Sequence, residues 1–127
     1  MNYPFDPTSR LIVVPAILWG PARDSEFRLA LDTGAAYSLI SAEAVAYLGY
    51  DLAMATESVN IVTGSGRVEA PRLGVSKVAA LGQERSAFSF LCHTLPPAAK
   101  LDGLLGLDFL RGHRLVVDFR AGLLSLD

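Results

Sequence analysis

The chain has 127 residues, the size of one domain, and its 11 basic and 13 acidic side chains leave a net charge of −2. This balance argues against a basic nucleic-acid-binding surface and against an acidic disordered tail. Apolar residues make up 51% of the sequence and charged residues only 19%. We therefore expect the domain to bury apolar surface in a contact with another subunit.

The single cysteine, Cys92, excludes an intrachain disulfide and is compatible with a reducing compartment. The apolar run from Leu11 to Trp19 is interrupted by Pro15 and is too short to cross a bilayer. The first ten residues lack the basic region of a signal peptide. We expect no membrane span and a cytoplasmic location.

The first half of the chain alternates short strand patterns with turns. Residues 1–9 are polar, contain two prolines, and are expected to form an N-terminal arm of a single domain covering residues 1–127. Pro15 places the first strand at a sheet edge or a bulge. Ser41 and Gly49 are a typical N-cap and C-terminal stop for the helix between them. The expected elements are strands over Leu11–Leu18, Glu26–Leu31 and Tyr37–Ile40, and a helix over Ala42–Leu48.

The second half is richer in strands. A glycine-rich turn, Thr63-Gly64-Ser65-Gly66, separates the strand patterns Val59–Val62 and Arg67–Ala70 and predicts a β-hairpin. The further expected elements are strands over Val75–Leu81 and Ser86–Leu91 joined by a turn over Gly82–Arg85, a helical turn over Leu107–Arg111, and a hairpin of Leu115–Phe119 with Leu123–Leu126. Many short strands with one or two small helices predict a mostly β domain, either a barrel or two packed sheets.

Asp32 is the most informative residue, because it follows an apolar strand and enters a tight turn at Gly34. A carboxylate in such a place is costly unless it is hydrogen-bonded or functional. The structural alternative is an Asx-turn, in which the side chain only caps the turn. Asp-Thr-Gly alone does not decide between the two.

A second segment, Leu104-Leu105-Gly106, is followed by the short helical pattern Leu107-Asp108-Phe109-Leu110. Together with Leu31-Asp32-Thr33-Gly34-Ala35, this segment resembles the corresponding motifs of the retropepsin-like aspartic proteases, the single-domain relatives of pepsin. The order of the motifs fits, and a glycine-tipped hairpin lies where that family has its flap. The resemblance extends from Leu11 to Leu126. It implies a single-lobe acid-protease barrel with a flap hairpin.

The resemblance also implies a function. Aspartic proteases activate one water between two carboxyl groups that share a proton. This chain has one Asp-Thr-Gly, and Asp102, Asp108 and Asp118 lack that context, so they are expected to serve turns or a solvated surface. A second copy must therefore supply the second Asp32. The expected protein is a homodimeric aspartic endopeptidase with a polypeptide substrate, without a cofactor or metal, and without nucleic acid as a partner.

Further roles follow from the resemblance, residue by residue. Thr33 would hold the two catalytic loops together, and Gly34 would let the backbone approach the substrate. The remaining substrate-binding residues would be Ala35 and Ala36 beside the motif, Thr63, Gly64, Ser65 and Gly66 in the flap tip, and Leu104 and Leu105 in the cleft walls. For the two leucines the alternative is core packing, and for the flap glycines it is an ordinary hairpin turn.

Two features depart from the viral members of that family. Those members carry an acidic residue where this chain has Ala36, and often an arginine where it has Leu107, so their ion pair is missing. The chain also continues into a full C-terminal hairpin. We expect this hairpin and Leu11–Leu18 to contribute to the dimer interface, without the viral interleaved sheet.

The remaining histidines, the cysteine and two aromatic residues are expected to have structural roles, and two other functions are compatible with parts of the sequence. His93 and His113 lack metal-ligand spacing, Cys92 is expected to be a buried thiol, and Trp19 and Tyr37 are expected to pack, with Tyr37 near the Asp32 loop. Apolar-Asp-x-Gly also occurs in the phosphate loop of actin-like sugar kinases, which need a second domain. A dimeric peptide-binding module without turnover is the alternative from a different functional class.

Overall fold

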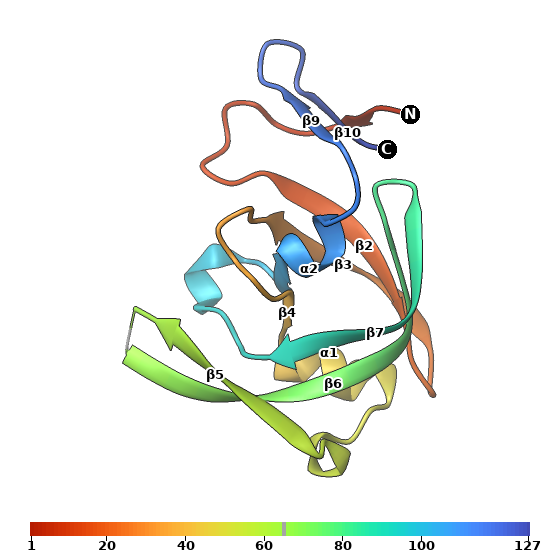
Figure 1. Ribbon diagram of the computed structural model, residues 1–127, viewed down its shortest axis with the longest axis vertical. Coiled ribbons are helices and arrows are strands. Elements are labelled where there is room, and N and C mark those ends of the chain that lie inside the picture. The colour runs from red at the N-terminus through yellow and green to blue at the C-terminus, as the bar shows by residue number, and fades with distance from the viewer. Residues whose placement is uncertain (65) are drawn as a thin grey trace.

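The computed structural model describes residues 1–64 and 66–127, and the fold is a six-stranded barrel with a small second sheet above it (Figure 1). Strands follow the order β2-β3-β8-β4-β7-β6-β5, and an additional pairing of β2 with β6 closes the first six into a ring. This confirms the predicted barrel. The strands of the barrel sheet are β2 (Val13–Trp19), β3 (Asp24–Leu31), β4 (Leu39–Ile40), β5 (Glu57–Thr63), β6 (Gly66–Ala80), β7 (Gln83–Cys92) and β8 (Gly103–Leu105).

Helices are few and short. α1 (Ala42–Leu48) has the predicted bounds: the side chain of Ser41 accepts a hydrogen bond from the Ala44 amide, and Gly49 ends the helix with φ +94°. α2 (Leu107–Leu110) is the predicted helical turn. Two 3₁₀ turns lie at η1 (Leu52–Met54) and η2 (Pro97–Ala99). No helix in the described part of the chain is long and apolar enough to cross a membrane.

The strands differ from prediction mainly around the hairpin of β6 and β7. The expected strand pieces on either side of Pro71 form one 15-residue strand, β6. The turn that follows contains only Leu81 and Gly82, with φ values of +53° and +77°, and not the four residues from Gly82 to Arg85. Two successive positive φ values match the twist of a tight hairpin. Sequence patterns missed this turn because Leu81 rarely adopts such a conformation.

Pro15 lies where the sequence predicted, at an edge. The pairing of β2 with β6 starts only at Ala16, so Val13 to Pro15 pair with β3 alone. Proline has no amide hydrogen to donate and is tolerated at such a position. The barrel therefore closes over only part of the length of β2.

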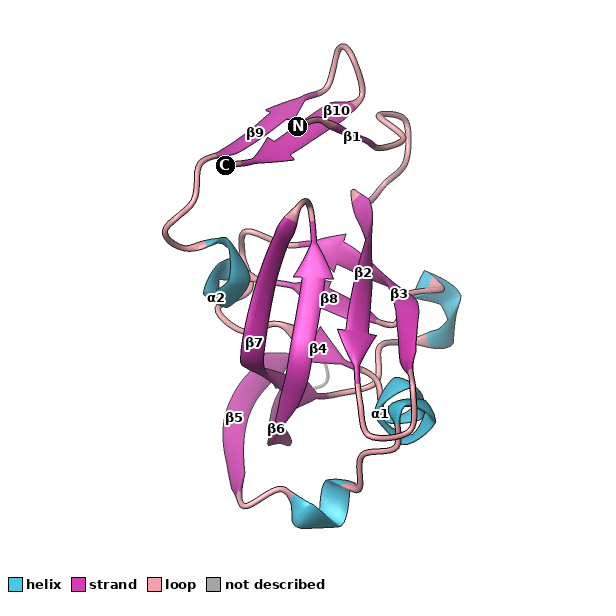
Figure 2. Cartoon of the chain, turned by 90° about the vertical axis from the view of Figure 1, so that its right-hand side faces the viewer, coloured by secondary structure: helices cyan, strands magenta, loops and turns pink. Residues whose placement is uncertain are grey.

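The termini form a separate three-stranded sheet, which Figure 2 shows above the open end of the barrel. Its central strand, β10 (Leu123–Leu126), pairs with β9 (Leu115–Asp118) on one side and with β1 (Tyr3–Pro4) on the other. Phe5 is buried. The expected N-terminal arm is therefore partly a strand of this terminal sheet, and the predicted C-terminal hairpin is confirmed.

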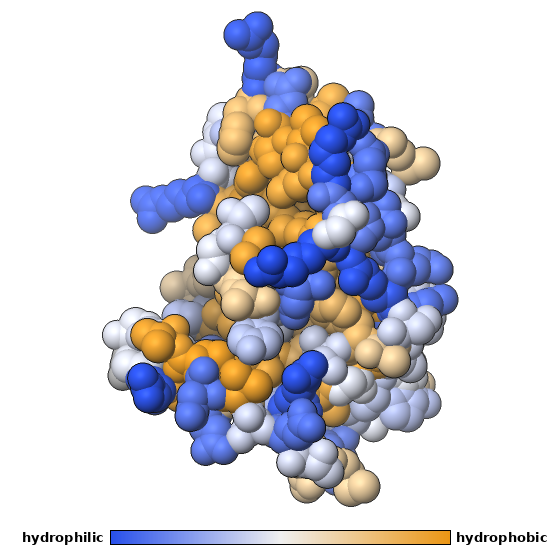
Figure 3. All heavy atoms as spheres, viewed as in Figure 1, coloured by the Kyte–Doolittle hydropathy of each residue, from blue (hydrophilic) through white to orange (hydrophobic). Residues whose placement is uncertain are grey.

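Most of the core is one cluster inside the barrel, and it extends to the terminal sheet through Leu124 and Leu126. The outer surface still carries apolar areas. In Figure 3, hydrophobic side chains gather over the terminal sheet and over the hairpin of β5 and β6. Phe119 is 63% exposed at the tip of the terminal hairpin, and Val62 is 81% exposed near the end of β5.

Gly103 makes the closest backbone packing in the barrel, because β8 lies between β3 and β4. A Cβ at this position would collide with the Leu39 carbonyl oxygen and would lie 3.1 Å from the Ile40 Cα. We predict that Gly103→Ala lowers the free energy of unfolding by about 1–3 kcal/mol or prevents folding, as overpacking does. Gly74→Ala is the control, since nothing lies within 4 Å of its added Cβ. Urea denaturation checks both, and equal stability of the two variants would contradict the expectation.

Cys92 is a buried thiol, as predicted. Burial raises the pKa of the Cys92 thiol, and the nearby Glu43 carboxylate raises it further. Because the thiolate is the reactive form, we predict that alkylation at pH 8 is more than about tenfold slower in the folded protein than in guanidinium. The measurement is mass-spectrometric labelling over time. Rapid labelling of the native chain would show that Cys92 is accessible.

Candidate active site

Asp32 directly follows β3, and its main chain is tied to the neighbouring strand. The Asp32 amide donates to the Leu105 carbonyl oxygen at 2.9 Å. The side-chain Oδ1 accepts a hydrogen bond from the Gly34 amide at 2.8 Å, so the Asx-turn considered from the sequence is present. No hydrogen bond joins Oδ2 to the described part of the chain. Asp32 is half-buried. The Gly34 amide orients the side chain through Oδ1, and these contacts leave Oδ2 without a hydrogen bond to the described residues.

The two sequence motifs lie side by side. β8 runs parallel to β3, with Leu31 opposite Leu105, and antiparallel to β4. The Leu107 amide donates to the Ala35 carbonyl oxygen at 2.8 Å. A Cβ on Gly106 would lie only 2.7 Å from that same oxygen, so only glycine allows this approach. The structure thus places the Asp32 segment next to the Leu104–Gly106 segment, the two motifs on which the resemblance rests.

A cleft of about 910 Å³ opens beside Asp32. One side is the hairpin of β5 and β6, which we call the flap hairpin, and the other is the segment from His93 to Pro97 after β7. The lining residues are Asp32, Gly34, Ala35, Ala36, Tyr37, Leu39, Asn60, Ile61, Val62, Thr63, Gly64, Val68, His93, Thr94, Leu95, Pro96, Pro97 and Leu104. Among the described residues of this lining, Asp32 is the only one with a carboxyl group, and none is a lysine or arginine.

Most of the predicted site residues reach this cleft. Asp32, Gly34, Ala35, Ala36, Thr63, Gly64 and Leu104 all line it. Thr33 is exposed next to the cleft. Gly66 pairs with Thr63 at the start of β6 and has φ +107°, a conformation that favours glycine. Ser65 lies outside the described residues.

The side chains of Leu104 and Leu105 lie on opposite faces of β8, because successive side chains of a strand alternate between its two faces. Leu104 lines the cleft, whereas Leu105 is fully buried in the core. Leu105 thus takes the core position that was the alternative considered from the sequence, and its part in substrate binding stays a prediction.

Several cleft residues were not predicted from the sequence. No strand, helix or substrate-binding role was predicted for the segment from His93 to Pro97, yet it forms one wall of the cleft. The signal that could have found it is positional: β7 ends at Cys92 beside β4, so whatever follows must emerge near the Asp32 loop. In β5, Asn60, Ile61 and Val62 also line the cleft, and Tyr37 does so as its position suggested.

The other aspartates are engaged elsewhere. Asp118 accepts hydrogen bonds from the Arg120 and Ala121 amides in the terminal hairpin, a turn role as predicted. Asp102 accepts one from the Arg28 amide at 2.8 Å. Asp108 is half-buried, not solvated as expected, because its carboxylate is bound by Ser38. Among the described residues, no group of three or more potential ligands could hold a metal ion.

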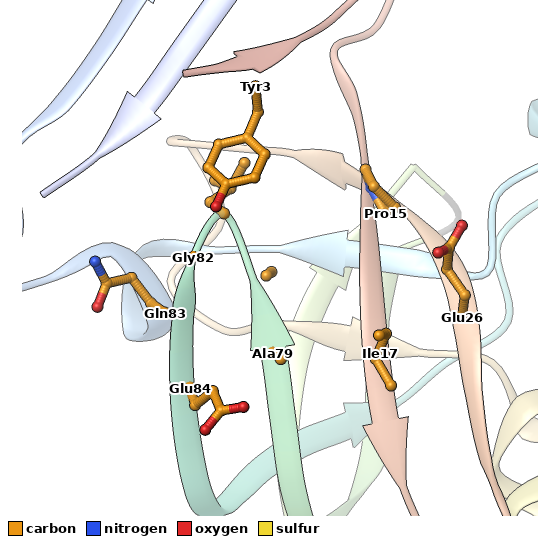
Figure 4. Close-up of a pocket in the computed structure, with 10 residues that line it drawn as sticks. Tyr3, Pro15, Ile17, Glu26, Ala79, Gly82, Gln83 and Glu84 are labelled. Carbon is orange, nitrogen blue, oxygen red and sulfur yellow. The ribbon is translucent and has the colours of Figure 1, made fainter. Parts of the chain in front are cut away.

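A second hollow, of about 510 Å³, lies on the outer surface of the barrel, away from the sequence motifs. Figure 4 shows Glu84, Ala79, Ile17 and Glu26 side by side across four strands, with Tyr3 of β1 above them. The register explains this row, because Ile17 lies opposite both Glu26 and Ala79, and Ala79 lies opposite Glu84. No residue of the Asp32 cleft takes part in it.

The comparisons with known proteins agree with this geometry. Residues 22–112 match the family model described as "gag-polyprotein putative aspartyl protease". The curated proteins contain no significant match. A retropepsin-like aspartic protease from Rickettsia conorii has a similar structure, with a TM-score of 0.73, 19% identity, and coverage of 99% of this chain and 88% of that chain.

The retroviral protease-like domain of Ddi1 from Leishmania major is also similar, with a TM-score of 0.62, 21% identity, and coverage of 94% of this chain and 90% of that chain. At these identities the structural likeness shows a shared fold. The family match spans both motifs and the flap hairpin between them. The chain therefore belongs to the gag-polyprotein aspartyl protease family and has the retropepsin-like fold.

Proposed function

We propose that the protein is an aspartic endopeptidase that acts as a homodimer. The observation that carries this proposal is the cleft, in which Asp32 lies between a flap hairpin and an opposite wall. An extended peptide laid along this cleft would pass over the carboxylate. The apolar lining, from Leu39, Ile61 and Leu104 among others, favours substrates with apolar side chains on both sides of the scissile bond.

The second carboxyl group comes from a second copy of the chain. Asp102, Asp108 and Asp118 are held by hydrogen bonds to Arg28, Ser38 and the terminal turn, so none of them is available beside Asp32. Thr33 and Gly34 are exposed in the single chain. A two-fold axis next to this loop would bring two Asp32 residues together and would cover both exposed residues.

The reaction then needs only the two carboxyl groups and water. Two carboxyl groups about 3 Å apart share one proton. The ionised group takes a proton from water as the oxygen attacks the scissile carbonyl carbon, and the protonated group donates to the carbonyl oxygen. The tetrahedral intermediate collapses when the C–N bond breaks: the leaving nitrogen receives the proton that the base took from water, and the other carboxyl group takes back a proton as the carbonyl reforms. The flap hairpin would close over the peptide and exclude solvent.

The interface that we propose includes the terminal sheet. Its central strand β10 has both neighbours from its own chain, so a partner strand cannot insert beside it. The terminal sheet and its surroundings also offer apolar side chains to a partner: Val116 and Phe119 of the terminal hairpin are 43% and 63% exposed, and Leu11 is exposed as well. Burying such side chains between two copies would stabilise the dimer.

The decisive variant for catalysis is Asp32→Asn. Asparagine keeps an oxygen that can accept from the Gly34 amide, so the loop should keep its shape, but it cannot act as a base. We predict that hydrolysis of fluorogenic peptides with apolar residues around the scissile bond falls at least about a thousandfold between pH 4 and 7.

The matched control is Asp51→Asn, which changes the exposed aspartate that caps η1, outside the cleft and the proposed interface, and should keep the parent rate. Equal cleavage by the parent and the Asp32→Asn variant would refute the proposal. So would a parent that binds peptides in the cleft and never cleaves them, because that result identifies a peptide-binding module.

Subunit mixing tests the homodimer. When parent and Asp32→Asn chains are refolded together in equal amounts, random pairing leaves about one quarter of the dimers with two aspartates. We predict that activity falls to that fraction of the parent value at the same total concentration. Sedimentation velocity on the parent gives the oligomeric state. A fall to one half, together with an active monomer, would contradict a shared site.

A further inference from the structure

The loop that carries Asp32 is attached to the second motif at three places. Asp32 is bound at its amide by Leu105, and Ala35 accepts at its carbonyl from Leu107. Both contacts are between main-chain atoms and would survive most substitutions. The third attachment is at Ser38, where the loop leaves for β4, and it is made by side chains.

Ser38 is fully buried, and its hydroxyl, amide and carbonyl groups are all hydrogen-bonded. Its hydroxyl donates to Asp108 Oδ1 at 2.6 Å and accepts from the Gly106 amide at 3.0 Å. Its own amide donates to the Asp108 carboxylate, at 2.9 Å to Oδ2. Its carbonyl oxygen accepts from the Leu91 amide of β7 at 3.0 Å. One serine thus joins the Asp32 loop to α2, to the glycine of the second motif, and to β7.

Asp108 suits this place because a carboxylate accepts several hydrogen bonds at once. Besides the two donors of Ser38, the Phe109 amide donates to Oδ1 at 2.9 Å. Hydrogen bonds to an ionised acceptor are shorter and stronger than neutral ones, and a half-buried site shields them from water. Asp108 also lies in the first turn of α2, where backbone amides favour a negative charge.

We propose that Ser38 and Asp108 are positioning residues. Together they fix the position and orientation of the Asp32 loop, and with it the carboxylate that faces the substrate. This inference rests on the proposed function for its kinetic consequence. Without the pair, the loop would keep its main-chain contacts, including that of the Ser38 carbonyl oxygen with the Leu91 amide, but its exit would lose the side-chain contacts with α2 and Gly106. A displacement of a catalytic group by about 1 Å can cost about a hundredfold in rate.

The kinetic experiment uses Asp108→Ala, Ser38→Ala and the double variant, with Asp51→Ala as the matched control. Rates are normalised to active sites titrated with a tight-binding transition-state analogue, at a temperature where circular dichroism shows each variant folded. We expect kcat to fall about 10- to 100-fold with KM within about threefold of the parent. The double variant should equal either single variant, because the residues act as one unit. Asp108→Asn, which keeps one accepting oxygen, should lie between Asp108→Ala and the parent.

Hydrogen exchange gives a readout that does not depend on activity. We expect the peptide covering residues 32–38 to exchange at least about tenfold faster in Asp108→Ala than in Asp51→Ala, with β6 and β7 unchanged. Unchanged exchange in this loop, or a kcat per titrated site equal to that of the parent, would overturn the inference. A parent without Asp32-dependent hydrolysis would instead refute the proposed function, and the exchange result would still decide whether the pair fixes the loop.

Discussion

The parallel contact between β3 and β8 is the constraint on which the rest of the structure depends. It brings the Asp32 loop and the second motif within main-chain hydrogen-bonding distance, although they are far apart in the sequence. Two glycines make this possible: Gly103 lies against the Leu39 carbonyl, and Gly106 against the Ala35 carbonyl. Any side chain at either position would push the two segments apart. The motif glycines therefore act as spacers of the site and not only as turn residues.

The cleft combines parts that have different structural origins. Asp32 is held by strand pairing and by its own turn, whereas the flap hairpin projects from the barrel edge as an extension of β5 and β6. The opposite wall comes from an irregular segment after β7. A floor built on paired strands with less regular sides suits the proposed function, in which varied peptides would bind over one fixed carboxylate.

The sequence predicted elements whose signals are local. Ser41 and Gly49 defined α1, the hairpin patterns defined the flap and the C-terminus, and Pro15 marked an edge. The sequence was less informative where contacts with distant segments of the chain decide what a residue does. The roles of Leu104 and Leu105 depend on which face of β8 meets the core, and the role of Asp108 depends on Ser38, which is distant in the sequence. The wall from His93 to Pro97 carries no motif, so only the path of β7 places it in the cleft.

The pairing of the first strand with the last has a consequence for the order of folding. β1 pairs with β10, with Tyr3 opposite Leu124. β3 pairs with β8, with Leu29 opposite Gly103, and this pair cannot form before β8 is synthesised. Contacts between such distant segments require a large loss of chain entropy before they gain any packing, so they form late. During synthesis the Asp32 loop emerges early but lacks its support until β8 has left the ribosome. Until then a growing chain lacks the assembled Asp32 cleft, and the terminal sheet closes only after β10 has emerged.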